Sequence, residues 1–192
     1  MEFGDIVRRR RMVRNYTDQP VKADAVERIV DAGVCAPSAG FSQGQRFVVV
    51  TDAGRRRAVA EAAGEAEYLE QGFDSWISRA PVHIVICTDK QAYIDRYDEP
   101  DKGGTEDWNV PYWWVDAGAS LMAILYAALN ENLAAGFLGA HTLGDLHGIL
   151  GIPAEILIAG IVTIGHPAPC PRSGSLERGR IPRGDAVHGE MW

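Results

Sequence analysis

The sequence predicts one compact α/β domain in which helices and short strands alternate. The chain has 192 residues, of which 46% are hydrophobic and 23% are charged, a balance typical of a globular protein with one core. Segments with apolar residues at helical spacing alternate with short β-branched runs. No repeat, low-complexity segment or linker divides the chain, so we expect a single domain over residues 1–192.

The first half of the chain predicts three helices and two strands. Helical spacing predicts a short N-terminal helix, a helix over residues 24–35 that ends before Pro37, and a helix around residues 55–63. Residues 47–50 are a short β-branched run, typical of a strand buried on both faces, and a second strand is expected over residues 82–88. Residues 89–111 carry charges and glycines without an apolar period, which predicts a long loop or lid.

The second half is organised around an apolar segment at residues 112–130. This segment is apolar nearly all round, so we expect a central helix that is buried on most of its circumference. Its longest apolar run, residues 117–129, is shorter than the ~20 residues of a membrane-spanning helix. A strand at residues 135–140, a short helix at 143–150 and a strand at 156–164 follow. The tail, residues 169–192, is rich in Pro, Gly and Arg and ends in apolar anchors, so we expect it to extend onto a partner subunit.

Charge and cysteine content exclude several classes of protein. The formal charge of −7 and the pI near 5.2 argue against a general binder of nucleic acid or anionic membranes. The three cysteines include no C-x-x-C pair, which favours a reducing compartment over a disulfide framework or a zinc ribbon. The first residues have no basic segment followed by an apolar one, so we expect no secretion signal and a cytoplasmic protein.

Arginines near both ends are the most informative side chains. Arg10, Arg11 and Arg14 follow the first predicted helix, and Arg178, Arg180 and Arg183 flank a proline in the tail. Guanidinium groups suit bidentate phosphate binding, so both clusters together could form one phosphate site in an otherwise acidic protein. The alternative is that they are solvated surface, as charge runs usually are.

Other motifs are absent or weak. Neither G-x-G-x-x-G nor G-x-x-x-x-G-K-[ST] occurs, which argues against a Rossmann dinucleotide site and a P-loop. His141, Asp145 and His147 could be mistaken for metal ligands, but loop or helix-cap roles fit their spacing better, and we expect no metal site. Ser38 lacks a nucleophile elbow and Cys35 has no evident histidine partner, so nucleophilic catalysis is not supported.

Five segments in order resemble the nitroreductase family. They are RRMVRNY followed by QPV at residues 10–21, APSAGFSQ at 36–43, the apolar helix followed by LAAGFLG at 133–139, LGIP at 150–153 with TIGHPA at 163–168, and RGRIP at 178–182 with VH at 187–188 and the terminal Trp192. The resemblance spans nearly the whole chain. It departs from the family pattern at Met12, usually serine, and at Phe41, commonly asparagine.

The resemblance implies an α+β fold with a central, mostly antiparallel sheet flanked by helices. It further implies an intertwined homodimer with exchanged C-terminal tails and one FMN at each of two interface sites. The family transfers hydride from NAD(P)H to FMN and then to an electron acceptor in a ping-pong reaction. Because the flavin performs the difficult step, no catalytic side chain is expected.

The resemblance also assigns roles to individual residues. Arginines from both ends would hold the FMN phosphate and ribityl chain, residues 37–41 of the neighbouring subunit would cover the ring, and backbone groups at 138–140 would lie near its N5 and O4 edge. The complete expected cofactor set is Arg10, Arg11, Met12, Arg14, Pro37, Ser38, Ala39, Phe41, Gln43, Leu138, Gly139, Ala140, Arg178 and Arg180. The acceptor pocket is expected at Phe41, Trp108, Tyr112, Trp113 and His141, since aromatic side chains beside a loop suit flat substrates. For Trp113 and Trp114, packing in the core or at a dimer interface is an equal alternative.

The leading hypothesis is therefore an FMN-dependent NAD(P)H oxidoreductase acting on a flat organic acceptor such as a nitroaromatic or a quinone. A specialised relative is the second enzyme hypothesis: a flavin-fragmenting enzyme, a dehydrogenase of dipeptides or azolines, or a protein that uses deazaflavin. A flavin-binding protein without turnover is the third.

Overall fold

A four-stranded antiparallel sheet forms the centre of the molecule. The computed structural model describes residues 1–171 and 173–192. The strands are β1 (Gln45–Val50), β2 (Val82–Asp89), β3 (Ala134–Gly139) and β4 (Ile156–Gly165), in the spatial order β1-β2-β4-β3. Every neighbouring pair is antiparallel, with a register shift between Ile86 and Cys87. This confirms the α+β class and the antiparallel sheet that the family resemblance implied.

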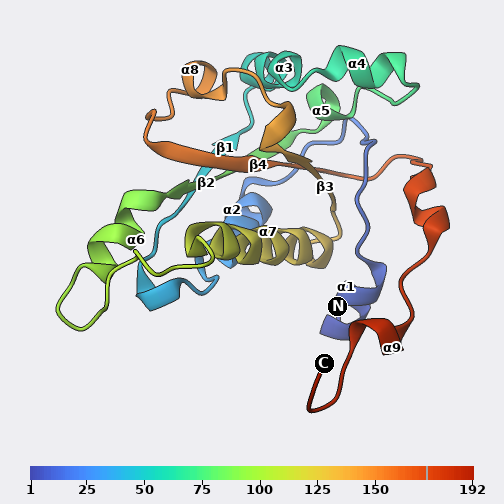
Figure 1. Cartoon of the computed structure of the whole chain (residues 1–192). Helices are drawn as coiled ribbons and strands as arrows, with labels where there is room; N and C mark the ends of the chain where they lie inside the picture. The colour runs from blue at the N-terminus through green and yellow to red at the C-terminus, as the bar shows by residue number, and fades with distance from the viewer. Residues whose placement is uncertain (172) are drawn as a thin grey trace.

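Two helices cover one face of the sheet (Figure 1). They are α2 (Ala23–Val34) and α7 (Tyr112–Asn130), and their apolar residues share one core with alternate residues of the central strands, such as Ile84 and Val162. The two helices approach closely, because the Ser120 hydroxyl donates to the Gly33 carbonyl at 3.0 Å. A side chain at Gly33 would meet Ile124 at 2.8 Å. The short helix α1 (Phe3–Arg9) contacts α7.

Four short helices lie over the opposite face. They are α3 (Ala53–Ala62), α4 (Glu65–Glu70), α5 (Trp76–Arg79) and α8 (Leu146–Leu150). Val59 and Leu146 pack there against Val85 and Ile161 of the central strands. The helices α4 and α5 were not predicted, because their sequence has no apolar period. The nearly buried Glu65 carboxylate supports α5 instead, accepting hydrogen bonds from the Ile77 and Ser78 amides at 2.7 and 2.9 Å.

Two predictions about single elements were wrong. β1 is an edge strand rather than a strand buried on both faces, and Val49 is 42% exposed. Residues 90–97 of the predicted loop form helix α6 (Lys90–Tyr97), which begins where the Asp89 carboxylate accepts from the Ala92 amide at 3.3 Å. Tyr93 anchors α6 because its side chain is completely buried. In addition, α8 begins at Leu146, three residues later than the start predicted at position 143.

The central helix α7 is less buried than the sequence indicated. Ala117, Ile124 and Ala128 are in the core, but Trp114 and Val115 are 41% and 49% exposed. By length and composition alone α7 could cross a membrane. Its inner face is occupied, however, by α2 and the sheet, as in the core helix of a globular domain. These exposed residues lie in the N-terminal half of α7, whereas Phe3 of α1 packs edge-to-face on Tyr126 in its C-terminal half, with ring centroids 5.8 Å apart.

The C-terminal segment follows β4 and extends away from the sheet. It contains η3 (Gly174–Arg178) and α9 (Arg183–Ala186), and it passes beside the N-terminal segment, so that both termini lie at the same side of the molecule (Figure 1). Its apolar side chains are exposed, Leu176 at 64%, Ile181 at 68% and Trp192 at 100%. Two further short turns matter for the site, η1 (Ala39–Phe41) and η2 (Ala140–Thr142).

Candidate functional site

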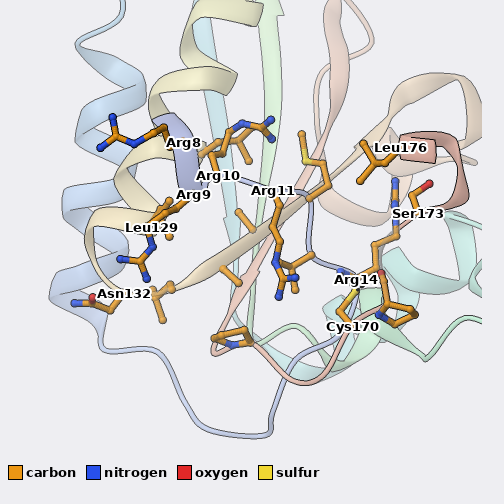
Figure 2. A pocket seen from close by; sticks show the side chains of 18 of the residues that line it. Arg8, Arg9, Arg10, Arg11, Arg14, Leu129, Asn132, Cys170, Ser173 and Leu176 are labelled. Atoms are coloured by element: carbon orange, nitrogen blue, oxygen red, sulfur yellow. Dashed lines mark hydrogen bonds between the residues drawn. The ribbon is translucent and has the colours of Figure 1, made fainter. Parts of the chain in front are cut away.

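A cavity lies between the N-terminal segment, the C-terminal half of α7 and the tail. It has a volume of about 890 Å³, within the range of small-molecule sites. Figure 2 shows arginine side chains distributed along it, with Arg9 near Leu129 and Arg14 near Cys170. Its arginines are Arg8, Arg9, Arg10, Arg11, Arg14 and Arg180. We call this cavity the arginine pocket.

Residues 10–14, which we call the arginine segment, have a backbone that is fixed against the sheet. Met12 forms a parallel bridge with Ala135 of β3, and the Val13 amide donates to the Ala135 carbonyl at 3.0 Å. Gly136 permits this close approach, because a Cβ there would collide with the Val13 carbonyl oxygen. The buried Tyr16 hydroxyl donates to the same Val13 carbonyl at 2.9 Å. The arginines therefore extend from an ordered strand-like segment rather than from a free loop.

Arg14 has the most defined surroundings of these arginines. Its guanidinium carbon lies 5.7 Å from the centre of the Trp76 ring, and its amide donates to Cys170 Sγ at 3.3 Å. The neighbouring Asn15 carboxamide oxygen accepts from Arg79 at 2.9 Å. Trp76 and Arg79 both belong to α5, so this helix supports the pocket. Sequence reasoning missed this role because it missed α5; the only signal was the aromatic Trp76 shortly before a strand.

The charge of the pocket is strongly positive although the whole chain is acidic. Six arginines contribute to its wall, and among the described lining residues there is no Asp or Glu. One of the six, Arg8, is paired with Asp5 outside the lining. Guanidinium groups bind phosphate oxygens bidentately, and local positive charge without acidic neighbours favours an anionic group. The donor set therefore fits a ligand that carries a phosphate.

The structure brings together part of the expected phosphate-binding set. Arg10, Arg11, Met12 and Arg14 line the same pocket as Arg180 from the tail. Arg178, in η3, is not among the lining residues. Leu138, Gly139 and Ala140 lie at and just beyond the far end of β3, whereas the pocket is lined by Ala134 and Ala135 at the near end.

The expected ring-covering residues form a separate turn at the N-terminal end of α7. Residues 38–43 of this turn contact α6 and α7, and the Ala39 amide donates to Asp116 of α7 at 2.9 Å. Pro37 precedes the turn. The turn ends at Gln43, whose backbone amide donates to the Ser38 hydroxyl at 2.9 Å. Phe41 is 75% exposed. In one chain this turn and the arginine pocket are near opposite ends of α7.

Three of the expected acceptor-pocket residues meet in one aromatic cluster. Trp108 lies at its centre, with ring centroids 4.7 Å from Tyr97, 4.9 Å from Tyr112 and 6.0 Å from Trp113. Trp113 also packs edge-to-face on the buried Tyr93 at 6.3 Å, so it has a packing role. His141 belongs to another region: it is exposed in η2, after β3.

The residues that could be mistaken for metal ligands have structural partners. Asp145 caps α8 by accepting from the Gly148 amide at 2.8 Å, and a His147 ring nitrogen lies 2.9 Å from the Ile156 carbonyl. These contacts give Asp145 and His147 structural roles in and beside α8.

Comparison with known proteins is decisive for the family. The model of the nitroreductase family matches residues 7–166. This chain belongs to the nitroreductase family. Among curated relatives, an FMN reductase [NAD(P)H] of Bacillus subtilis is 29% identical, over 95% of this chain and 71% of that protein. An NADPH-flavin oxidoreductase of Vibrio harveyi is 26% identical, over 93% of this chain and 69% of that protein.

A solved member of the nitroreductase family supports the fold over its full length. The crystal structure of a nitroreductase-type protein of Desulfovibrio desulfuricans in complex with FMN superposes with a TM-score of 0.75. The two chains are 27% identical, and the match covers 100% of this chain and 98% of that one.

Proposed function

We propose that this chain is an FMN-dependent oxidoreductase that takes hydride from NAD(P)H and passes it to a flat organic acceptor. The observation that carries the proposal is the arginine pocket, in which guanidinium groups from both ends of the chain line one cavity. The names of the two curated relatives, and the FMN in the solved relative, support the cofactor and the reductant.

The residues present fit FMN. A phosphate dianion needs two or three guanidinium or amide donors, and Arg10, Arg11, Arg14 and Arg180 can supply them. FMN, when bound, supplies the hydride-accepting and hydride-donating chemistry, so the chain needs no acid–base pair of its own. The roles of the chain are to anchor the phosphate, to hold the ring and to exclude water around it.

We propose a homodimer that pairs through the exposed outer face of α7. This helix has 19 residues and is about 28 Å long, with the arginine pocket at Leu125 and Leu129 and the turn at Asp116. Antiparallel pairing of two such helices around a twofold axis would bring the turn of one subunit to the pocket of the other. The exposed apolar tail residues, such as Leu176 and Ile181, would then be covered by the partner.

In such a dimer, Pro37, Ser38, Ala39, Phe41 and Gln43 of one subunit would cover the cofactor held by the other. The aromatic cluster of Trp108, Tyr112 and Trp113 would face the flat acceptor, a nitroaromatic or a quinone. The segment 98–111, which follows α6, would act as the lid. Leu138, Gly139, Ala140, Arg178 and His141 remain assigned to the site by family resemblance alone. The three unpaired cysteines fit the reducing cytoplasm.

The test is anaerobic titration of the purified protein. We expect a yellow protein whose flavin absorbance is bleached by NADPH or NADH and recovers on addition of a quinone. A colourless protein that does not take up FMN would refute the cofactor. Bleaching by reduced deazaflavin but by neither nicotinamide would favour a specialised relative, and FMN binding without any bleaching would indicate a binding protein.

A double variant tests the phosphate assignment. Arg10→Ala with Arg180→Ala removes one guanidinium group from each end of the chain, so FMN should be lost on gel filtration. As a matched control, Arg55→Ala with Arg57→Ala removes two exposed arginines of α3 and should leave FMN bound. Full retention of FMN in the pocket variant would contradict the assignment.

A further inference from the structure

The turn at residues 38–43 has an unusual backbone. Gly40, Phe41 and Gln43 have φ of 59°, 58° and 52°, in the left-handed region. Glycine adopts this region freely, but a bulky residue such as phenylalanine does so rarely and at an energetic cost. Such a conformation persists only where surrounding contacts impose it. Phe41 is nevertheless 75% exposed, so its own packing does not impose it.

Two side chains from neighbouring helices hold the backbone of the turn just before Phe41, at Ala39 and Gly40. The carboxylate of Asp116, a residue 6% exposed, accepts from the Ala39 amide at 2.9 Å. Arg96 of α6 donates through Nε to the Gly40 carbonyl at 2.9 Å. The guanidinium group of Arg96 is itself oriented by two hydrogen bonds to Asp101, at 2.7 and 2.8 Å. Both contacts are charge-assisted, and such hydrogen bonds are stronger than neutral ones.

The same turn rests directly on the aromatic cluster. A Cβ at Gly40 would meet the Tyr97 ring at 2.7 Å, so only glycine allows this approach. Tyr97 contacts Trp108, whose ring is packed between Tyr97 and Tyr112. The exposed ring of Phe41 is therefore carried on a turn that is seated on the cluster expected to face the acceptor.

We propose that Arg96 and Asp116 are positioning residues, which fix the turn at residues 38–43 so that Phe41 is presented as a rigid stacking surface for a flat acceptor. Neither side chain needs to touch the acceptor, because each acts on the backbone of the turn. The ring of Phe41 would stack on the acceptor in the site of the partner subunit. This inference rests on the proposed function for the identity of the ligand, but the restraint on Phe41 itself is a property of the chain.

The kinetic test is a double-mutant cycle with Phe41. Arg96→Met keeps the aliphatic stem and removes the donor, and we expect the KM for a quinone to rise about tenfold with kcat nearly unchanged, as for the loss of one hydrogen bond to a charged group. Phe41→Ala should raise KM by at least as much. Adding Arg96→Met to Phe41→Ala should then have no further effect on KM, because Arg96 acts only by positioning the Phe41 ring, which is absent in this variant.

Two variants separate positioning from general structural damage. Arg28→Met is the matched control, since Arg28 of α2 also binds two carboxylates, Asp24 and Glu131, but does not touch the turn. It should leave KM unchanged. Asp116→Asn retains an acceptor for the Ala39 amide and should keep KM close to that of the unsubstituted protein, whereas Asp116→Ala should raise it. If Asp116→Ala does not fold, Arg96→Met alone still tests whether a side chain outside the turn positions Phe41.

A spectroscopic readout is independent of flavin and turnover. The chain has 5 phenylalanines, so 4-fluorophenylalanine labelling gives five ¹⁹F resonances, and the one missing in Phe41→Ala identifies position 41. We expect that resonance to be single in the unsubstituted protein and to broaden or split in Arg96→Met, because the released turn would exchange between conformations. An unchanged resonance, or KM effects that add in the double variant, would overturn the proposal. Absence of FMN binding would instead refute the proposed function. The ¹⁹F result would then still test whether Arg96 restrains the turn at Phe41.

Discussion

Replacing Arg14 by glutamine should weaken the binding of FMN far more than the binding of riboflavin. The Arg14 guanidinium carbon lies 5.7 Å from the Trp76 ring centre, and its backbone is fixed through Cys170. The group is thus oriented before the ligand arrives, and little side-chain entropy is lost on binding. A hydrogen bond to a charged group contributes about 1.5–3 kcal/mol, which corresponds to a rise in the FMN dissociation constant of about 10- to 150-fold. Riboflavin lacks the phosphate, so its affinity should change little.

The assay is titration of the apoprotein with each flavin at low and at high salt. Binding is measured as quenching of the flavin fluorescence. Arg57→Gln is the control, because Arg57 is an exposed arginine of α3 and does not line the pocket. High salt should reduce the difference between Arg14→Gln and the unsubstituted protein, since screening weakens charge pairs. Equal losses of affinity for FMN and riboflavin would show that Arg14 supports the fold rather than the phosphate, and this result would refute the reasoning.

Two further predictions concern stability and the seating of the arginine segment. Burial lowers the pKa of His83 to about 4, against about 6.5 in the unfolded chain, so the unfolded state binds more protons between these values and stability is lost as the pH falls through that window. Between pH 6.5 and 4.5 the unfolding free energy of His83→Gln, measured by urea denaturation, should therefore fall by about 2 kcal/mol less than that of the unsubstituted protein. An equal fall in both proteins would contradict this. Gly136→Ala should lower both the melting temperature and the affinity for FMN, because the new Cβ would displace the Val13 carbonyl; retention of both would show that the segment can shift without cost.

The sequence was sufficient for the elements whose signal is local. The β-branched runs of β2 and β4 and the long apolar segment of α7 were predicted within a few residues, because strands in the centre of a sheet and a long apolar helix each leave a continuous apolar pattern. The arginines were also recognisable from composition, since clustered guanidinium groups are conspicuous in an acidic chain. Their convergence in one pocket required the structure, which fixes Met12 beside Ala135 and brings the tail past the N-terminal segment.

The missed elements depend on tertiary contacts that no local pattern contains. Helix α5 has four residues and begins where the Glu65 carboxylate, twelve residues earlier than Ile77, accepts two amides. Helix α6 is mostly polar and depends on one buried side chain, Tyr93. The edge position of β1 could not be predicted either. A valine such as Val49 occurs both in edge strands and in central strands, so the local sequence does not show whether another strand lies beside it. Short helices and sheet edges are therefore where the sequence was least informative.

The position of the site follows from the length of one helix. The arginine pocket contacts α7 at Leu125 and Leu129, and the Phe41 turn is bound to it at Asp116, so one helix separates the two parts by about 14–20 Å along its axis. One chain therefore holds the two parts apart along α7. A substitution on the exposed face of α7, such as Val115→Glu, should therefore dissociate the proposed dimer and weaken FMN binding together, even though Val115 does not line the arginine pocket. Loss of FMN affinity in a variant that remains dimeric, or full affinity in a monomer, would contradict a site shared between two copies.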